Sequence, residues 1–386
     1  MKILLGQLGA NGDCLYATVL ARQIKEDYPG CHLTWAISSR CKEVLTANPY
    51  VDEIWEWNVS DTVRDAAWRA LETTALRIQT GLDPFDKVVL SQIWPDNFRR
   101  YDGTVRPSIV RAYDRPITAP VDTVIVLTDQ ELDHVEKFVR LHGIDNYGHR
   151  ILIECSSRSG QSYVTPTFVM EMVRLLSGRL RDCCFILSSD SPISSDLPAV
   201  FSAHELGMRE NAALTHYCSH FIGCGSGLTV VATSSAAKEL PTIQVLAART
   251  SVYASFFHDF EYWGKPTERF IEMGDASAET VADAIFTCCR DGLDTARATF
   301  HRPLQVTFDF YLELIDQWLV QRCMYLDALE SLSITALRYG WNKQLLDYAR
   351  RRVVPLAKFD ALCMDPRSRK PSQKQIDQIL AAQPNL

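Results

Sequence analysis

Short apolar runs alternate with segments of helical period along the first part of the chain. The runs have the length and apolar content of buried strands, and they lie at 2–5, 32–37, 53–57, 87–90 and 123–127. The helical patterns between them lie near 14–27, 40–47, 61–78 and 129–142. Because strands that alternate with helices pair in parallel, with a helix crossing over the sheet, the pattern predicts an α/β domain over residues 1–148.

A second series of the same kind begins at residue 149. Its strand-like runs lie at 151–155, 184–189, 220–224 and 242–246, and its helical patterns lie at 166–177, 209–217 and 228–237. We therefore expect a second α/β domain over 149–300. Two such domains face each other across a cleft, and ligands in sheets of this kind lie beyond the carboxyl ends of the strands.

Two segments depart from this alternation. The segment 102–122 holds three prolines and little helical period, which predicts a long functional loop. After about residue 300 the strand signals stop, and apolar residues keep a helical spacing, as from Phe308 to Leu319. The region 301–386 is therefore predicted to be a helical appendage, with a helix that crosses back to the first domain and a basic tail.

Composition indicates a folded chain without a membrane segment. Of the 386 residues, 47% are hydrophobic, which is enough for folded cores. No apolar run is long enough for a membrane helix, and Gly6, Gly9 and Gly12 interrupt the N-terminal apolar stretch too early for a signal sequence. We expect the protein in the cytoplasm. The twelve cysteines include no C-x-x-C pair, which favours buried free thiols.

Possible metal ligands cluster at one place, His216, Cys218, His220 and Cys224. The two histidines have the i,i+4 spacing of a helix face, but no H-E-x-x-H motif accompanies them. The segment itself has the pattern of a helix end and a buried strand. The chain also has no D-x-D triplet that would bridge a metal to a diphosphate. We therefore predict no metal ion and no cofactor.

Charge is distributed unevenly. The chain carries a formal net charge of −7, yet the segment 338–374 holds ten Lys or Arg and three Asp or Glu. Such a basic segment on an acidic body has two interpretations: a solvated helix face, or a local contact with an anionic membrane surface or glycan. It does not indicate general binding of nucleic acid.

The turn GQLGANGD, from Gly6 to Asp13, joins the first strand to the first helix. A dinucleotide site requires G-x-G-x-x-G and an acidic residue at the end of the second strand, but here the turn is G-x-x-G-x-x-G and that strand ends in Ser38, Ser39 and Arg40. A P-loop lysine is absent as well. Asp13 has two explanations. It either caps the helix, or it is a general base that the helix N-terminus keeps ionised and that takes a proton from a substrate hydroxyl.

Two turns in the second half have the composition of anion sites. The first, CSSRSGQSY at 155–163, supplies the hydroxyls of Ser156 and Ser157 together with Arg158, which suits a diphosphate. The second, GCGSGLTVVA at 223–232, runs from a strand into a helix and presents backbone amides to an anion. Two anion sites that face a carboxylate suit the transfer of a group from a nucleotide diphosphate to a hydroxyl.

At this point the sequence resembles a known family. The stretch MKILLGQLGANGDCLYATVLARQIKEDYPGCHLTWAISSRCKEVLTANPYVDEIWEW, residues 1–57, is similar to the N-terminal half of the glycosyltransferase family 9 heptosyltransferases, with their L-G-x-x-G-D, Y-P and N-P-x-V-D-E motifs. The resemblance implies the GT-B fold and a metal-independent transfer that inverts the anomeric centre. It also implies that Asp13 is the catalytic base and that Asn11 and Gly12 line the acceptor side.

In the second half RSGQSYVTP resembles the family's R-x-x-K-x-W-P segment, and residues 225–230 fall on its D-T-G-x-x-H turn. The implied contacts to the donor diphosphate are Ser156, Ser157, Arg158, Gln161, Ser226, Gly227, Leu228 and Thr229, with Gly225 on the side of the donor sugar. The family's lysine, aspartate and histidine are replaced here, by Gln161, Gly225 and Val230. The identity of the donor therefore does not carry over.

The leading hypothesis is an inverting, metal-independent glycosyltransferase. It would move a heptose or another hexose-type sugar from a nucleotide diphosphate to a hydroxyl of a glycan or lipopolysaccharide-type acceptor. Two alternatives stay open: a nucleotide-sugar epimerase, which converts a donor without an acceptor, and a GT-B-shaped nucleotide-binding or assembly protein without turnover.

Overall fold

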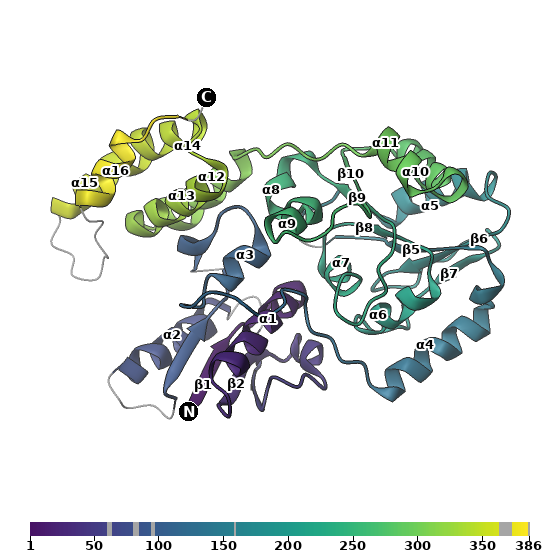
Figure 1. Ribbon diagram of the computed structural model, residues 1–386, viewed down its shortest axis with the longest axis horizontal. Helices are drawn as coiled ribbons and strands as arrows, with labels where there is room; N and C mark the ends of the chain where they lie inside the picture. The colour runs from purple at the N-terminus through teal and green to yellow at the C-terminus, as the bar shows by residue number, and fades with distance from the viewer. Residues whose placement is uncertain (60–63, 80–84, 94–96, 158–159, 363–372, 385–386) are drawn as a thin grey trace.

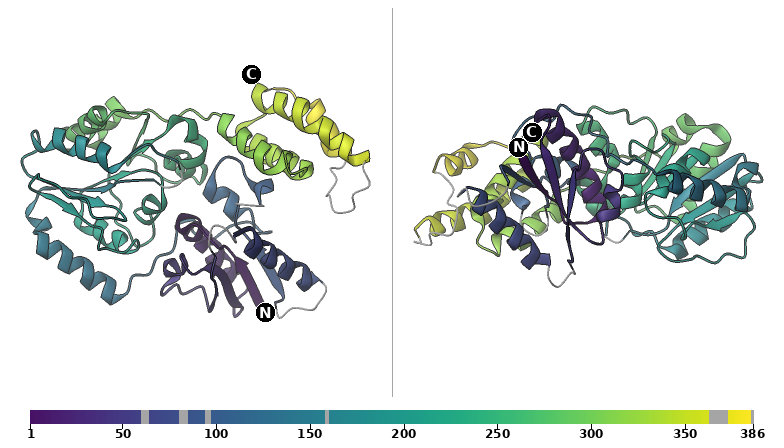
Figure 2. Two further views of the ribbon diagram at one scale, coloured as in Figure 1. Left: turned by 180° about the vertical axis from the view of Figure 1, so that it is seen from behind. Right: turned by 90° about the horizontal axis from the view of Figure 1, so that it is seen from below.

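The computed structural model describes residues 1–59, 64–79, 85–93, 97–157, 160–362 and 373–384. Two parallel sheets form separate domains, each with its own helices, and a further group of helices lies beside the first domain (Figure 1). The views from behind and from below place these three parts in the same way (Figure 2). No helix in the described ranges is long and apolar enough to cross a membrane.

The first sheet has the strand order β3-β2-β1-β4, and all its pairs are parallel. Its strands are β1 (Lys2–Gly6), β2 (His32–Ser38), β3 (Glu53–Trp57) and β4 (Lys87–Leu90). The accompanying helices are α1 (Asn11–Asp27), η1 (Lys42–Leu45), α2 (Arg64–Gln79), η2 (Phe98–Arg100) and α3 (Val105–Val110). Ile3, Leu4 and Leu5 are fully buried, as expected for a central parallel strand that is covered on both faces.

The second sheet is also entirely parallel, with the order β10-β9-β8-β5-β6-β7. Its strands are β5 (His149–Glu154), β6 (Cys183–Ser188), β7 (Val200–Ser202), β8 (His220–Gly223), β9 (Thr242–Leu246) and β10 (Phe270–Gly274). Its longer helices are α4 (Asp129–His142), α5 (Pro166–Ser177), α10 (Ala278–Asp291) and α11 (Leu293–Phe300). Its shorter ones are η3 (Ile144–Asn146), α6 (Glu210–Leu214), η4 (Thr215–Tyr217), α7 (Gly227–Val231), η5 (Ala248–Thr250), α8 (Ser251–Ala254) and α9 (Phe256–Tyr262).

Two Rossmann-like domains followed by a helical C-terminal region are the GT-B arrangement, so the predicted fold class is confirmed. The sequence did not reveal β7 and β10. In β10 a buried carboxylate, Glu272, interrupts the apolar run. Its burial is compensated by hydrogen bonds that it accepts from Ser255 Oγ at 2.5 Å and from the amide of Leu304 at 2.9 Å. Such a strand has no simple apolar pattern.

The strand expected at 123–127 is wrong. This segment links the domains in extended form and pairs with no sheet. Its amides bond to side chains instead: the amide of Val124 donates to Thr18 Oγ1 at 2.8 Å, and that of Ile125 to Ser235 Oγ at 3.3 Å. The segment is apolar because Val124 and Ile125 are buried at this junction, and the sequence pattern did not distinguish that burial from a strand.

The segment 102–122 is not a loop throughout, because α3 forms within it. Pro107 lies in the first turn of α3, where a missing amide hydrogen costs no helical hydrogen bond. At the other domain, α7 ends at Val231, well before the expected position 237.

The C-terminal helices lie beside the first domain (Figures 1 and 2). They are α12 (Asp309–Ile315), η6 (Asp316–Val320), α13 (Tyr325–Tyr339), α14 (Lys343–Tyr348), η7 (Ala349–Val353), α15 (Val354–Leu362) and α16 (Gln373–Ala381). Trp318 stacks on Phe98 with ring centroids 6.0 Å apart, and Ser331 Oγ donates to the carbonyl of Tyr101 at 2.6 Å.

Candidate active site

Asp13 lies in the first turn of α1, directly beyond the carboxyl end of β1. The N-cap of α1 is Ala10, which has no capping side chain, and the amide of Ala10 donates to the Asp13 carboxylate. Asp13 therefore supports the start of its helix, as the capping explanation requires.

The protonation of Asp13 differs from the expectation. Burial raises the pKa of Asp13 to about 7, and the hydrogen bond from Ala10 only partly opposes this effect. The sequence led us to expect that the helix N-terminus keeps this carboxylate ionised, but burial opposes that effect and outweighs it. A carboxylate with a pKa near 7 is a stronger base than an ordinary aspartate, which suits proton transfer at neutral pH.

The starts of α1 and α7 meet across the two domains. A β-carbon at Gly12 would lie 3.3 Å from Cα of Gly227 and 3.6 Å from Cγ2 of Val230. A β-carbon at Gly227 would lie 2.7 Å from Cε of Met208. The two glycines thus allow a close backbone contact, and a side chain at Gly12 would require its neighbours to shift. The contact brings the turn that carries Asp13 next to the turn 224–229.

Glu154, the last residue of β5, binds the turn 224–229. Its carboxylate accepts hydrogen bonds from the Cys224 amide at 2.5 Å, from Thr229 Oγ1 at 2.7 Å and from the Ser226 hydroxyl. Burial raises the pKa of Glu154, against these hydrogen bonds. Because the two hydroxyls are directed toward Glu154, an anion at this turn would meet the backbone amides at the start of α7, which have no acceptor within the helix. The sequence did not reveal this role, since a single Glu at a strand end carries no local signal.

Gly225 has a backbone conformation that favours glycine, with φ +72°. A β-carbon here would lie 2.9 Å from Cδ2 of Leu246 and 3.3 Å from the carbonyl oxygen of Ala254. The Gly225 amide donates to Thr229 Oγ1 at 3.0 Å. The aspartate of the related motif therefore has no room at position 225.

Residues 155–157 and 160–163 follow the end of β5. Ser157 Oγ donates to Gln161 Oε1 at 2.5 Å, and the carbonyl of Gln161 accepts from the Ala247 amide at 2.9 Å. Gln161 is buried, whereas Ser156 and Ser157 are partly exposed. Arg158 lies outside the described residues, so its predicted contact with a diphosphate stays a prediction.

Asn11 precedes Asp13 on the same turn of α1 and is partly exposed. Its Oδ1 atom is buried and has no hydrogen-bond partner among the described residues. A buried acceptor without a partner is costly, so a ligand hydroxyl that donates to it would remove this cost. The position fits the expected acceptor side.

Tyr253 of α8 is a further residue of this site that the sequence did not reveal. Its pKa is raised by burial and then by the charge of Asp13, so the two side chains lie within electrostatic reach of each other. A second contact between the domains involves Arg106. Its guanidinium lies 4.8 Å from the ring centre of Tyr16, and its Nε atom lies 3.2 Å from Oδ2 of Asp259. This contact joins α3 of the first domain to α9 of the second.

The candidate metal ligands of the segment 216–224 do not come together. Cys218 and Cys224 belong to different hydrophobic cores, and His216 Nε2 lies 2.9 Å from the carbonyl oxygen of Ala236. Burial lowers the pKa of His220 to about 4. The cysteines of the described ranges are all free, as predicted.

In the described part of the basic segment, 338–362 and 373–374, three arginines make contacts within the protein. The Arg338 side chain is buried and bonds to Asp102, and Arg350 donates to the carbonyl of Leu380 at 2.9 Å at the end of α16. Arg352 Nε donates to Asp316 at 2.9 Å, although the Arg352 side chain is half exposed.

Comparison with known proteins gives structural matches only. No family model matches the chain, and no curated protein matches its sequence. Among solved structures, a glycosyltransferase of family 9 from Veillonella parvula DSM 2008 matches at 14% identity and a TM-score of 0.49, over 83% of this chain and 97% of the other. The ADP-heptose LPS heptosyltransferase II of E. coli matches at 14% identity and a TM-score of 0.48, over 75% and 99%.

A protein from Listeria monocytogenes assigned as a UDP-N-acetylglucosamine 2-epimerase also matches, at 10% identity and a TM-score of 0.45, over 79% of this chain and 92% of the other.

Proposed function

We propose that the protein is a glycosyltransferase that moves a sugar from a nucleotide diphosphate to a hydroxyl of a glycan or lipopolysaccharide-type acceptor. The observation that carries this proposal is the position of Asp13, whose pKa is about 7, across the Gly12–Gly227 contact from the start of α7. A base and a group of anion-binding amides at one junction are the two elements that this reaction needs.

In the proposed reaction Asp13 removes the proton from the acceptor hydroxyl as that oxygen attacks the anomeric carbon of the donor. The bond from the anomeric carbon to the diphosphate breaks, and its electron pair leaves with the nucleoside diphosphate. A single displacement of this kind inverts the anomeric centre. Asn11 and Gly12 lie on the acceptor side, and Gly225 on the side of the donor sugar.

The donor diphosphate would be held by residues from both turns of the second domain: Ser156, Ser157, Arg158, Gln161, and the amides of Ser226, Gly227, Leu228 and Thr229. The chain has no D-x-D triplet, so we propose that these groups replace a metal ion in stabilising the leaving diphosphate. The two backbones touch at Gly12 and Gly227. We therefore place the donor and the acceptor beside this contact and not between the two glycines.

A screen of nucleoside diphosphates and their sugars tests this function. We expect at least one nucleoside diphosphate to raise the thermal midpoint, since a ligand at 100 times its Kd adds about 2.7 kcal/mol to the stability of the native state. With the matching sugar nucleotide and an acceptor, transfer should proceed without added Mg²⁺. Conversion of the sugar nucleotide without any acceptor would instead identify an epimerase, and binding without turnover an assembly protein.

The reaction should depend on pH through Asp13. Because the base must be unprotonated and its pKa is about 7, kcat/KM should fall about tenfold for each pH unit below 7 and level off above it. The measurement is a pH–rate profile with the donor and acceptor found in the screen. An acidic limb near pH 4 would contradict the proposed burial of this base, because it is the value of a solvated aspartate.

A further inference from the structure

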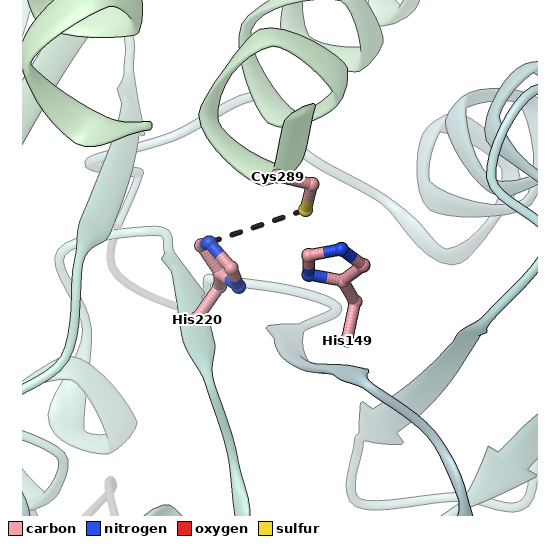
Figure 3. Close-up of side chains that lie close together, drawn as sticks. All are labelled: His149, His220 and Cys289. Carbon is pink, nitrogen blue, oxygen red and sulfur yellow. Dashed lines mark hydrogen bonds between the residues drawn. The ribbon is translucent and has the colours of Figure 1, made fainter. Parts of the chain in front are cut away.

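Three potential metal ligands lie at the end of the second sheet where β5 and β8 begin, opposite the candidate active site. They are His149 at the start of β5, His220 at the start of β8 and Cys289 in the last turn of α10 (Figure 3). One ligand atom of each lies within 4.8 Å of the others, and all three side chains are partly exposed. The candidate active site uses the carboxyl ends of the same strands, so the two sites are separate.

The sheet register explains why the histidines meet. β5 and β8 are neighbours, and Ile151 pairs with His220. Since side chains alternate between the faces of a sheet, His149, two residues before Ile151, lies on the same face as His220. α10 covers this face, where Cys288 and Ile285 pack into the core, and its last turn brings Cys289 over the two imidazoles (Figure 3).

Ser219 holds the ring of His220 from the other side. Ser219 Oγ accepts from the Arg150 amide at 2.8 Å and lies 2.8 Å from the Nδ1 atom of His220. The Nε2 atom of His220 faces the Cys289 Sγ atom at 4.0 Å. A ligating histidine whose other nitrogen is hydrogen-bonded to a neighbouring group is the usual arrangement around bound metal ions.

We propose that His149, His220 and Cys289 bind a zinc-type divalent cation, with water as a fourth ligand. In a tetrahedral site with Zn–N near 2.0 Å and Zn–S near 2.3 Å, ligand atoms are about 3.3–3.6 Å apart, so the present spacing closes with small side-chain rotations. Two imidazoles and a thiolate are the ligand types that such ions prefer. The ion would join the end of α10 to the starts of two central strands.

Cobalt substitution tests the site in the full-length protein. After treatment with a chelator, the chain should bind one Co²⁺ with a thiolate-to-cobalt charge-transfer band, and Zn²⁺ should displace it. Zn²⁺ should also raise the thermal midpoint by about 3–8 °C at 100 times its Kd. Absence of Co²⁺ and Zn²⁺ binding by the intact protein would overturn the proposal.

Variants locate the ion. Cys289→Ser should abolish the charge-transfer band, whereas Cys323→Ser, at an exposed cysteine outside the cluster, should keep it. His149→Gln should raise the Kd for Zn²⁺ at least about 100-fold, since even residues that only orient a ligand contribute 10- to 100-fold. His204→Gln, at an exposed histidine, should change nothing. A band that survives in Cys289→Ser, or an unchanged Kd in His149→Gln, would place the ion elsewhere. If Cys289→Ser without metal has a lower thermal midpoint than the wild type without metal, its lost band no longer identifies a ligand. The Kd of His149→Gln for Zn²⁺ then decides whether the ion binds at this cluster.

Discussion

Asp13→Asn is expected to lower turnover at least about 100-fold while the affinity for the nucleoside diphosphate stays within about twofold. The amide cannot accept the proton of the attacking hydroxyl, so the loss appears in kcat. Its oxygen can still accept the hydrogen bond from the Ala10 amide, so the start of α1 should keep its structure. Steady-state kinetics and calorimetric titration of the nucleoside diphosphate measure the two effects separately.

The matched control is Asp129→Asn, the same substitution in the first turn of α4. Asp129 is exposed and remote from the Gly12–Gly227 contact, so this variant should lose a few tenths of a kcal/mol of stability and no activity. Full turnover in Asp13→Asn would leave Asp13 with its helix-capping role alone. A parallel loss of nucleoside-diphosphate affinity would instead place the carboxylate in the donor site.

The fold was predictable where one pattern decides each element. Runs such as Ile3 to Leu5 are buried on both faces and bounded by turns, so length and composition were enough to place β1. The pattern failed where burial has another cause. Val124 and Ile125 are apolar and buried in the linker between the domains, where they form no strand. Glu272 is tolerated inside β10, since distant segments supply its hydrogen-bond partners.

The sequence suggested residues for the candidate site, but it did not reveal the contacts that surround them. Gly12 and Asp13 are recognisable as a turn and a helix start, and so are the glycines of 223–232. Three facts depend on contacts between segments far apart in the chain: the backbone contact of Gly12 with Gly227, the binding of Ser226 and Thr229 by Glu154, and the raised pKa of Asp13. No local spacing in the sequence encodes them.

The strongest effect on stability is expected at Asp102, which is fully buried in the first domain. Its Oδ2 atom lies 2.5 Å from Nη2 of Arg111 and 3.1 Å from Nη1 of Arg338, and its Oδ1 atom accepts from the Thr104 amide at 3.0 Å. Arg338 comes from α13 and also donates to the carbonyl of His258 at 3.3 Å. One carboxylate therefore joins the first domain, the second domain and the C-terminal helices.

Asp102→Ala should lower the free energy of unfolding by about 3–5 kcal/mol, because it leaves the buried guanidinium of Arg338 and the partly buried one of Arg111 without their counter-charge. Its matched control is Asp347→Ala, which removes exposed ion pairs with Lys343 and Arg351 and should cost under about 1 kcal/mol. Thermal and urea unfolding measure both, and limited proteolysis reports whether α13 detaches first.

Lowering the pH should reduce the difference in the free energy of unfolding between Asp102→Ala and the wild type. Burial alone would raise the pKa of Asp102, but the two arginines outweigh it and lower that pKa. The carboxylate therefore contributes fully above its unfolded-state pKa of about 3.9, and the contribution is lost as the pH falls through the lowered folded-state value. Equal stability of the variant and the wild type at neutral pH would show that the C-terminal helices are held by their apolar contacts, such as Trp318 on Phe98, without this ion cluster.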